Sequence, residues 1–134
     1  MLRTLSLRNE DGQAAAEFAL VLPLLAALLL GIAQFGIVFN NYITLTDATR
    51  AGARKAAVSR FIGDGGASAI TAVRNASSNL DQATLNVDVT ADNWTVPGGD
   101  VTVTASYPYS VNIPILGWTI AAGSLTSTTK ERLE

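Results

Sequence analysis

One carboxylate lies at the start of a long apolar segment. Glu17 precedes residues Phe18–Phe39, which carry no charge and include only Pro23, Gln34 and two glycines as interruptions. A charged side chain at the centre of a bilayer costs about 3 kcal/mol or more. Near the membrane edge it is tolerated if it finds a cation, such as a free α-amine. Glu17 is therefore the first candidate for chemistry; the alternative is an acid at headgroup level with no partner.

The composition excludes several kinds of site. The chain has 134 residues, a formal net charge of −2, and neither cysteine nor histidine. Disulfides, thiol catalysis, Cys/His zinc sites and a Ser-His triad are therefore excluded. A charge so close to zero gives no basic field for nucleic acid. We expect no catalytic residue, no cofactor and no nucleic-acid partner.

Three acids in the C-terminal half could form a cation site. Asp88, Asp92 and Asp100 would supply oxygen ligands for calcium if their side chains converged. Their spacing fits no EF-hand loop. We favour solvated acids near turns and expect no metal.

The apolar segment is long enough to cross a membrane. Residues 18–39 would form a helix of about 33 Å, and a hydrocarbon core is about 30 Å thick. A cleaved secretory signal would have a shorter apolar core and end at small residues, whereas this one ends in FGIVFNNYITL. The sequence predicts a retained single-pass membrane helix. Pro23 removes one backbone hydrogen bond and is expected to kink or loosen it, unless it is simply tolerated.

The helical pattern continues beyond the apolar segment to about Val58. Small residues share one helix face by their spacing of three and four: Ala48, Ala51, Gly52 and Ala56. Such a stripe permits close approach of helices. Two interpretations stay open: lateral packing with other subunits, or docking on the globular part of this chain.

The C-terminal half predicts a small α+β domain. FIGDGGAS reads as a linker, and residues 67–80 as a short helix. Alternating apolar residues predict strands in 84–90, in 101–109, which Pro108 should end or place at an edge, and within 119–134. SVNIPILGW is interpreted as an irregular apolar crossing. We expect a three-stranded antiparallel sheet covered by helix, with Tyr107 in the core and the places of Trp94 and Trp118 open.

The N-terminal motif resembles a known family. GQAAAEFALVLPLL, followed by a helix containing ATRAGAR, is similar to the TadE-like family, minor pilins or pseudopilins of the Tad (Flp) type IV pilus. The C-terminal segment STTKERLE resembles the last strand of that family. The resemblance does not separate a TadE-like from a TadF-like paralogue, and it implies a pilin-like fold.

The resemblance also implies how the chain is processed and used. A prepilin peptidase would cut after Gly12, remove a leader of residues 1–12 and leave Gln13 as the mature N-terminus. Glu17, followed by Phe18, would then pair with the N-terminal amine of a neighbouring pilin or pseudopilin subunit. Residues 13–58 would be the membrane and stalk helix, and residues 59–134 a periplasmic domain. The other implied partners are membrane lipid and the assembly platform of the bacterial inner membrane, and the implied roles are pilus assembly and surface adherence.

Charge near the membrane segment predicts the opposite orientation. In the leader Arg3 and Arg8 are offset by two acids, whereas Arg50, Arg54, Lys55 and Arg60 follow the apolar segment. Counting basic residues would place the C-terminal side in the cytoplasm. We follow the motif, which places the N-terminus in the cytoplasm. The alternative function is an uncleaved, membrane-anchored envelope binding module.

Overall fold

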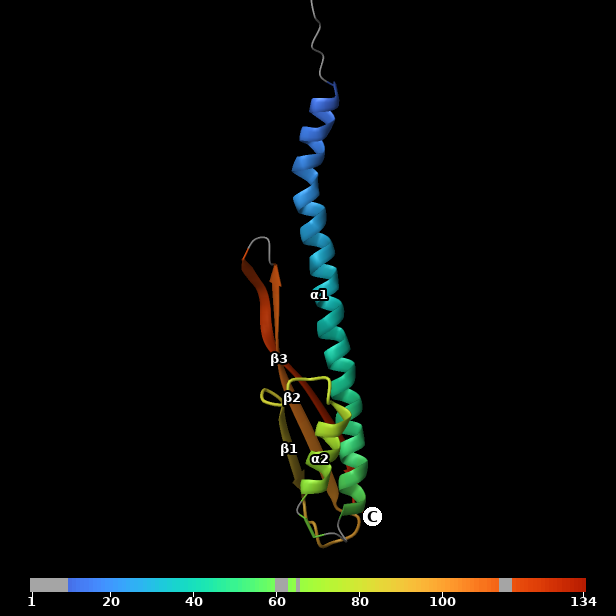
Figure 1. The fold of residues 1–134 in the computed structure, drawn as a ribbon. Coiled ribbons are helices and arrows are strands. Elements are labelled where there is room, and N and C mark those ends of the chain that lie inside the picture. Colours follow the sequence, from blue (N-terminus) through green and yellow to red (C-terminus); the bar gives the residue numbers. More distant parts are fainter. Residues whose placement is uncertain (1–9, 60–62, 65, 114–116) are drawn as a thin grey trace, which may run out of the picture.

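A single long helix forms the axis of the molecule, and the other elements pack beside its C-terminal half (Figure 1). The computed structural model describes residues 10–59, 63–64, 66–113 and 117–134. The elements are α1 (Glu10–Val58), α2 (Ala67–Ala76), β1 (Asn86–Ala91), β2 (Asp100–Ile113) and β3 (Trp118–Arg132). The predicted α+β fold, with a long helix, a short helix and a three-stranded antiparallel sheet, is confirmed.

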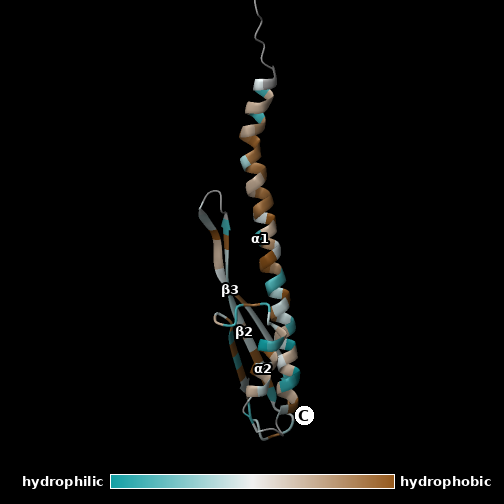
Figure 2. Cartoon of the chain, viewed as in Figure 1, coloured by the Kyte–Doolittle hydropathy of each residue, from teal (hydrophilic) through white to brown (hydrophobic). Residues whose placement is uncertain are grey.

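Helix α1 has two halves of different character. Its N-terminal half is apolar and exposed, as the brown colouring in Figure 2 shows, and it is long and apolar enough to cross a membrane. Its C-terminal half contributes Leu45, Ala48, Ala53 and Ala56 to the buried core. The helix continues through Pro23 without interruption. Most of the apolar half is therefore not covered by the rest of the described chain, which favours membrane anchoring.

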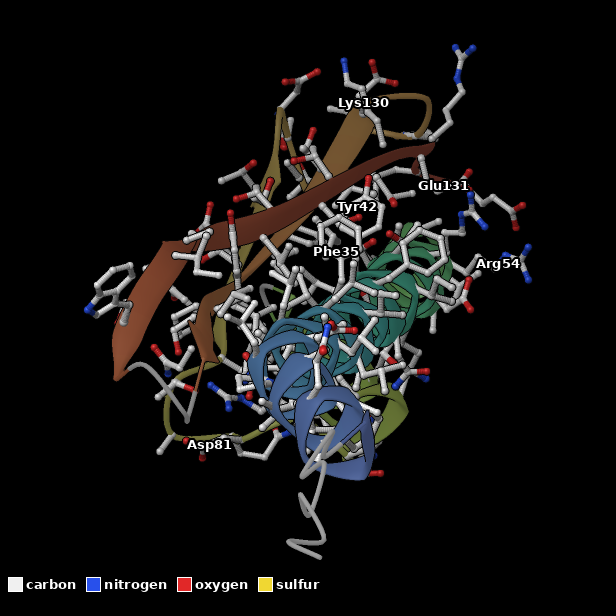
Figure 3. All side chains as sticks on the ribbon, turned by 90° about the horizontal axis from the view of Figure 1, so that it is seen from above. Phe35, Tyr42, Arg54, Asp81, Lys130 and Glu131 are labelled. Atoms are coloured by element: carbon white, nitrogen blue, oxygen red, sulfur yellow. The ribbon has the colours of Figure 1, made fainter. Side chains whose placement is uncertain are left out.

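The sheet is a meander in the order β1-β2-β3, antiparallel throughout. Alternate residues of β2 are buried, namely Val101, Val103 and Ala105, as the period of two requires. α1 packs against β2, β3 and α2, and it closes the core together with α2. Figure 3, viewed along α1, shows the sheet on one side of the helix and Arg54 pointing away from it.

Strand β2 is longer than predicted. β1 pairs with it only from Val101 to Ser106, so Pro108 lies where that side of β2 has no neighbouring strand. Proline is tolerated at such an edge because its missing N–H breaks no ladder bond there. The predicted strand end at Pro108 is absent, and the predicted edge position is confirmed.

The expected irregular crossing at SVNIPILGW is wrong for its described residues. Residues 110–113 continue β2 and Trp118 begins β3; residues 114–116 lie outside the described part. Pairing runs from Tyr107–Leu125 to Ile113–Trp118, with an irregularity between Val111 and Asn112. We call this two-stranded extension, residues 107–113 and 118–125, the hairpin arm. The sequence did not predict these strand residues, because apolar and polar residues do not alternate regularly in SVNIPILGW.

Helix α2 begins at a turn organised by one carboxylate. Asp64 accepts hydrogen bonds from the backbone N–H of Gly66 (3.1 Å) and of Ser68 (2.8 Å). Gly66 has a φ of 92°, which an L side chain rarely adopts. Ser68, through its side chain and its N–H, and then the N–H of Gly66, lower the pKa of Asp64. This turn replaces a side-chain cap on Gly66, the residue before the helix.

Candidate functional site

The candidate processing and assembly residues lie on the first turns of α1. Gly12, Gln13, Glu17 and Phe18 are all helical and exposed. Residues 1–9 of the expected leader lie outside the described residues. The Gln13 side-chain amide donates to Glu17 Oε1 at 3.0 Å, a contact between residues four apart on one helix face. Sequence reasoning did not note this pair, although its spacing could have indicated it.

Glu17 has no cation partner in the described part of the chain. The ion pairs there join Arg50 to Asp47 (3.6 Å) and Lys130 to Asp100 (2.8 Å). One exposed carboxylate, held by a single amide, thus stands at the start of the apolar half of α1. It can accept a charge-assisted hydrogen bond from a cation brought by another chain.

The small-residue stripe packs inside this chain. Ala48, Gly52 and Ala56 are buried, while Ala51 is exposed. A Cβ on Gly52 would overlap the Cγ2 methyl of Val73 and lie 3.3 Å from the carbonyl oxygen of Ala69. Of the two interpretations, lateral packing with other subunits or docking on this chain's own domain, the second is correct for these three positions.

A hydroxyl cluster fixes α1 to β3. Thr49 Oγ1 lies 2.9 Å from Ser127 Oγ and accepts a hydrogen bond from Thr129 Oγ1 at 3.1 Å. Both Thr49 and Ser127 are buried, so each hydroxyl needs a partner. Sequence reasoning missed this cluster, because single threonines and serines give no signal of distant pairing.

A second missed contact joins the apolar half of α1 to the hairpin arm. Gln34 Oε1 accepts the backbone N–H of Asn112 at 2.8 Å, and Gln34 Nε2 donates to the Asn112 carbonyl. The side-chain amide thus pairs with the strand as a neighbouring strand would. The signal was present, since Gln34 is the one amide between Phe18 and Phe39. A cleft of about 360 Å³ lies beside this contact, lined by residues including Ile37, Tyr107 and Tyr109.

The acids considered for calcium do not form a site in the described residues. No group of three Asp, Glu, His or Cys side chains able to hold a metal ion occurs there. Asp100 instead pairs with Lys130. That hydrogen bond and the attraction of the Lys130 charge lower the pKa of Asp100 and raise the pKa of Lys130.

The aromatic residues divide between core and surface. Trp94 and Tyr107 are partly buried against the core, as expected for Tyr107. Trp118 is 68% exposed at the end of the hairpin arm. The two tryptophans whose places the sequence left open therefore have different environments.

Comparison with known proteins finds one family. Residues 12–54 match the family model described as TadE-like protein. The predicted resemblance is confirmed over this segment, which begins at Gly12 and ends beyond Gly52. No curated protein and no solved structure matches the chain significantly. The match covers most of α1 and none of the sheet, so the similarity that it shows is limited to this helix.

Proposed function

We propose that this chain, whose residues 12–54 match the TadE-like family, is a minor pilin or pseudopilin subunit of a Tad (Flp) type IV pilus. It has no enzymatic activity and contributes to pilus assembly and surface adherence. The observation that carries the proposal is a family-matched helix whose apolar half is largely exposed and begins at an exposed carboxylate that has no cation partner among the described residues.

Processing after Gly12 would create the missing cation. Gly12 is exposed and adds no side-chain bulk against a prepilin peptidase. Cleavage would give Gln13 a free α-amine, one helical turn before Glu17. Because Glu17 is already held by the Gln13 side chain, its remaining lone pairs stay available to the amine of a neighbouring subunit.

The surface for other subunits is the apolar half of α1. The stripe of Ala48, Gly52 and Ala56 is already occupied by this chain's own domain. By contrast, a Cβ on Gly31 or Gly36 would meet no atom of the described chain within 4 Å. Small residues in an apolar helix permit close approach of a second helix. We therefore assign lateral packing to the side of residues 18–39 that the hairpin arm leaves free, first with membrane lipid and then with pilin subunits delivered by the inner-membrane assembly platform.

The proposed location is the bacterial inner membrane, with the N-terminus cytoplasmic and the C-terminal domain periplasmic. Arg50 and Arg54, which argue for the reverse, are exposed on the part of α1 that is packed on the domain. They begin about 16 Å beyond Phe39 along the helix. At that distance from the membrane segment we give them little weight for its orientation; Arg50 instead forms an ion pair with Asp47.

Glu17→Ala tests the assembly role. We expect the variant to insert into the membrane normally and to abolish incorporation into pili, because the neighbour's amine loses its carboxylate. Membrane fractionation measures insertion, and immunodetection of the subunit in sheared pili measures incorporation. Glu17→Asp, which keeps the charge, is the matched control and should retain part of the incorporation. Normal incorporation of Glu17→Ala would count against the role.

The second candidate function is an uncleaved, single-pass envelope binding module. The hairpin arm and the cleft beside it favour this reading, since they form a surface that the core does not use. This candidate predicts an intact N-terminus and no effect of Glu17→Ala on any assembly.

A further inference from the structure

The hairpin arm ends beside the apolar half of α1 (Figure 1). The contact between Gln34 and Asn112 fixes the level at which strand and helix meet. This level lies within the apolar segment and not beyond it. If α1 spans a bilayer, the arm must therefore meet the membrane.

The depth follows from the helix rise. Asn40 and Asn41 end the apolar segment, so a hydrocarbon core of about 30 Å must fit within residues 18–39. Gln34 lies five residues before Phe39, which is about 8 Å below the end of the segment. The end of the arm is thereby placed in the outer part of the hydrocarbon core, beneath the headgroups.

The contact between Gln34 and Asn112 lowers the cost of this depth for one residue of β2. Unsatisfied backbone groups are costly in lipid, and open strand edges are excluded from the hydrocarbon region. β1 no longer pairs with β2 beyond Ser106, so Asn112 lacks a third strand. Gln34 satisfies both the N–H and the carbonyl of Asn112, and Asn112 in turn satisfies the amide of Gln34.

The composition of the arm fits the same environment. No charged residue occurs between Asp100 and Lys130. Trp118 and Ile120 are exposed at the end of the arm, by 68% and 60%. Tryptophan is enriched where membranes meet water, because its ring is apolar and its N–H donates a hydrogen bond.

We propose that the end of the hairpin arm enters the leaflet on the domain side of the membrane, with the Trp118 ring just beneath the headgroups and Gln34 holding the strand at that depth. The contact belongs to the subunit before it leaves the bilayer. It rests on α1 spanning the membrane and does not depend on cleavage at Gly12 or on pilus assembly. The arm would fix the tilt and rotation of the domain above the membrane.

Tryptophan quenching tests the proposal, since the chain has two tryptophans at opposite ends of the sheet. Trp94 follows β1 near Val101, and Trp118 pairs with Ile113, about 40 Å further along β2. The full-length Trp94→Phe variant is placed in phosphatidylcholine vesicles, with and without lipid brominated near the headgroup end of its acyl chains. Trp118→Phe, which keeps Trp94, is the matched control. Retention of each variant by the vesicles in alkaline carbonate verifies the span first.

We expect brominated lipid to remove most of the Trp118 emission and to leave that of Trp94 unchanged. Aqueous iodide should quench Trp118 weakly. Quenching of Trp118 by iodide and not by brominated lipid would overturn the proposal, as would protection from both, which would mean that protein covers the arm. Gln34→Ala in the Trp94→Phe background should weaken quenching by lipid; unchanged quenching would overturn the role of Gln34.

Discussion

Gly52 lies at a close contact between α1 and α2. Any side chain there would meet Val73, which is fully buried, and would also approach Val103 Cγ1 at 3.4 Å. Glu17, by contrast, is exposed on the same helix and contacts only Gln13 among the described residues. At the residue scale, α1 thus carries a packing residue, Gly52, and a residue with a proposed assembly role, Glu17, and substitutions of the two should have separable effects.

Gly52→Ala is expected to destabilise the domain by about 1–3 kcal/mol, because an added methyl group overpacks a close contact. The measurement is chemical unfolding of the full-length chain in detergent, followed by circular dichroism. Gly36→Ala is the matched control, since a Cβ at Gly36 meets no described atom. Equal stability of Gly52→Ala and the unmodified chain would contradict the packing described for the stripe.

At the element scale, the start of α2 depends on the ionised form of Asp64. Its carboxylate accepts the backbone N–H groups of Gly66 and Ser68, and its pKa is lowered in the folded chain. A carboxyl group whose folded pKa is depressed stabilises the fold above its unfolded pKa. That contribution is lost as the pH falls through the folded pKa. Asp100, whose pKa Lys130 lowers, acts in the same direction.

We therefore expect that the contribution of Asp64 and Asp100 to Tm is constant between neutral pH and about pH 4. Below about pH 4 this contribution should decrease and Tm should fall. Asp64→Ala should lower Tm at pH 7 and reduce the loss of Tm on acidification. Thermal melts from pH 7 to pH 2 measure both effects. Asp88→Ala, at an exposed position for which the described residues give no side-chain hydrogen bond, serves as control. A larger acid sensitivity in Asp64→Ala than in the unmodified chain would refute this account.

Periodicity predicted most elements because each is amphipathic or apolar over several turns or residues. The helix from Gln13 to Val58, the short helix after Ala67 and the three strands all follow from local patterns. The hairpin arm did not, since SVNIPILGW lacks alternation. The partner of Gln34 also could not be predicted, because Asn112 lies 78 residues away and no local pattern encodes such a pair.

The candidate site comes from the motif and stays a prediction. Gly12, Gln13 and Glu17 were chosen from it, and the family match includes all three positions. The place of the small-residue stripe needed the structure. Spacing shows that Ala48, Gly52 and Ala56 share a face, but it does not show what covers that face.

At the scale of the whole molecule, one helix joins two environments. Its exposed apolar half begins at Glu17, and its C-terminal half packs on the sheet and on α2 (Figure 1). The hairpin arm adds a second connection between the domain and the apolar half through Gln34. Under the proposed function, such a chain would rest in a membrane and later exchange lipid for the helices of neighbouring subunits without refolding its domain.

The most direct test of the central proposal is the intact mass and N-terminal sequence of the protein isolated from membranes of its native host. The account predicts a chain that begins at Gln13, because the peptidase removes residues 1–12 and exposes the amine that Glu17 serves. A chain that still begins at Met1, in cells with an active prepilin peptidase, would contradict the pilin assignment and favour the anchored binding module.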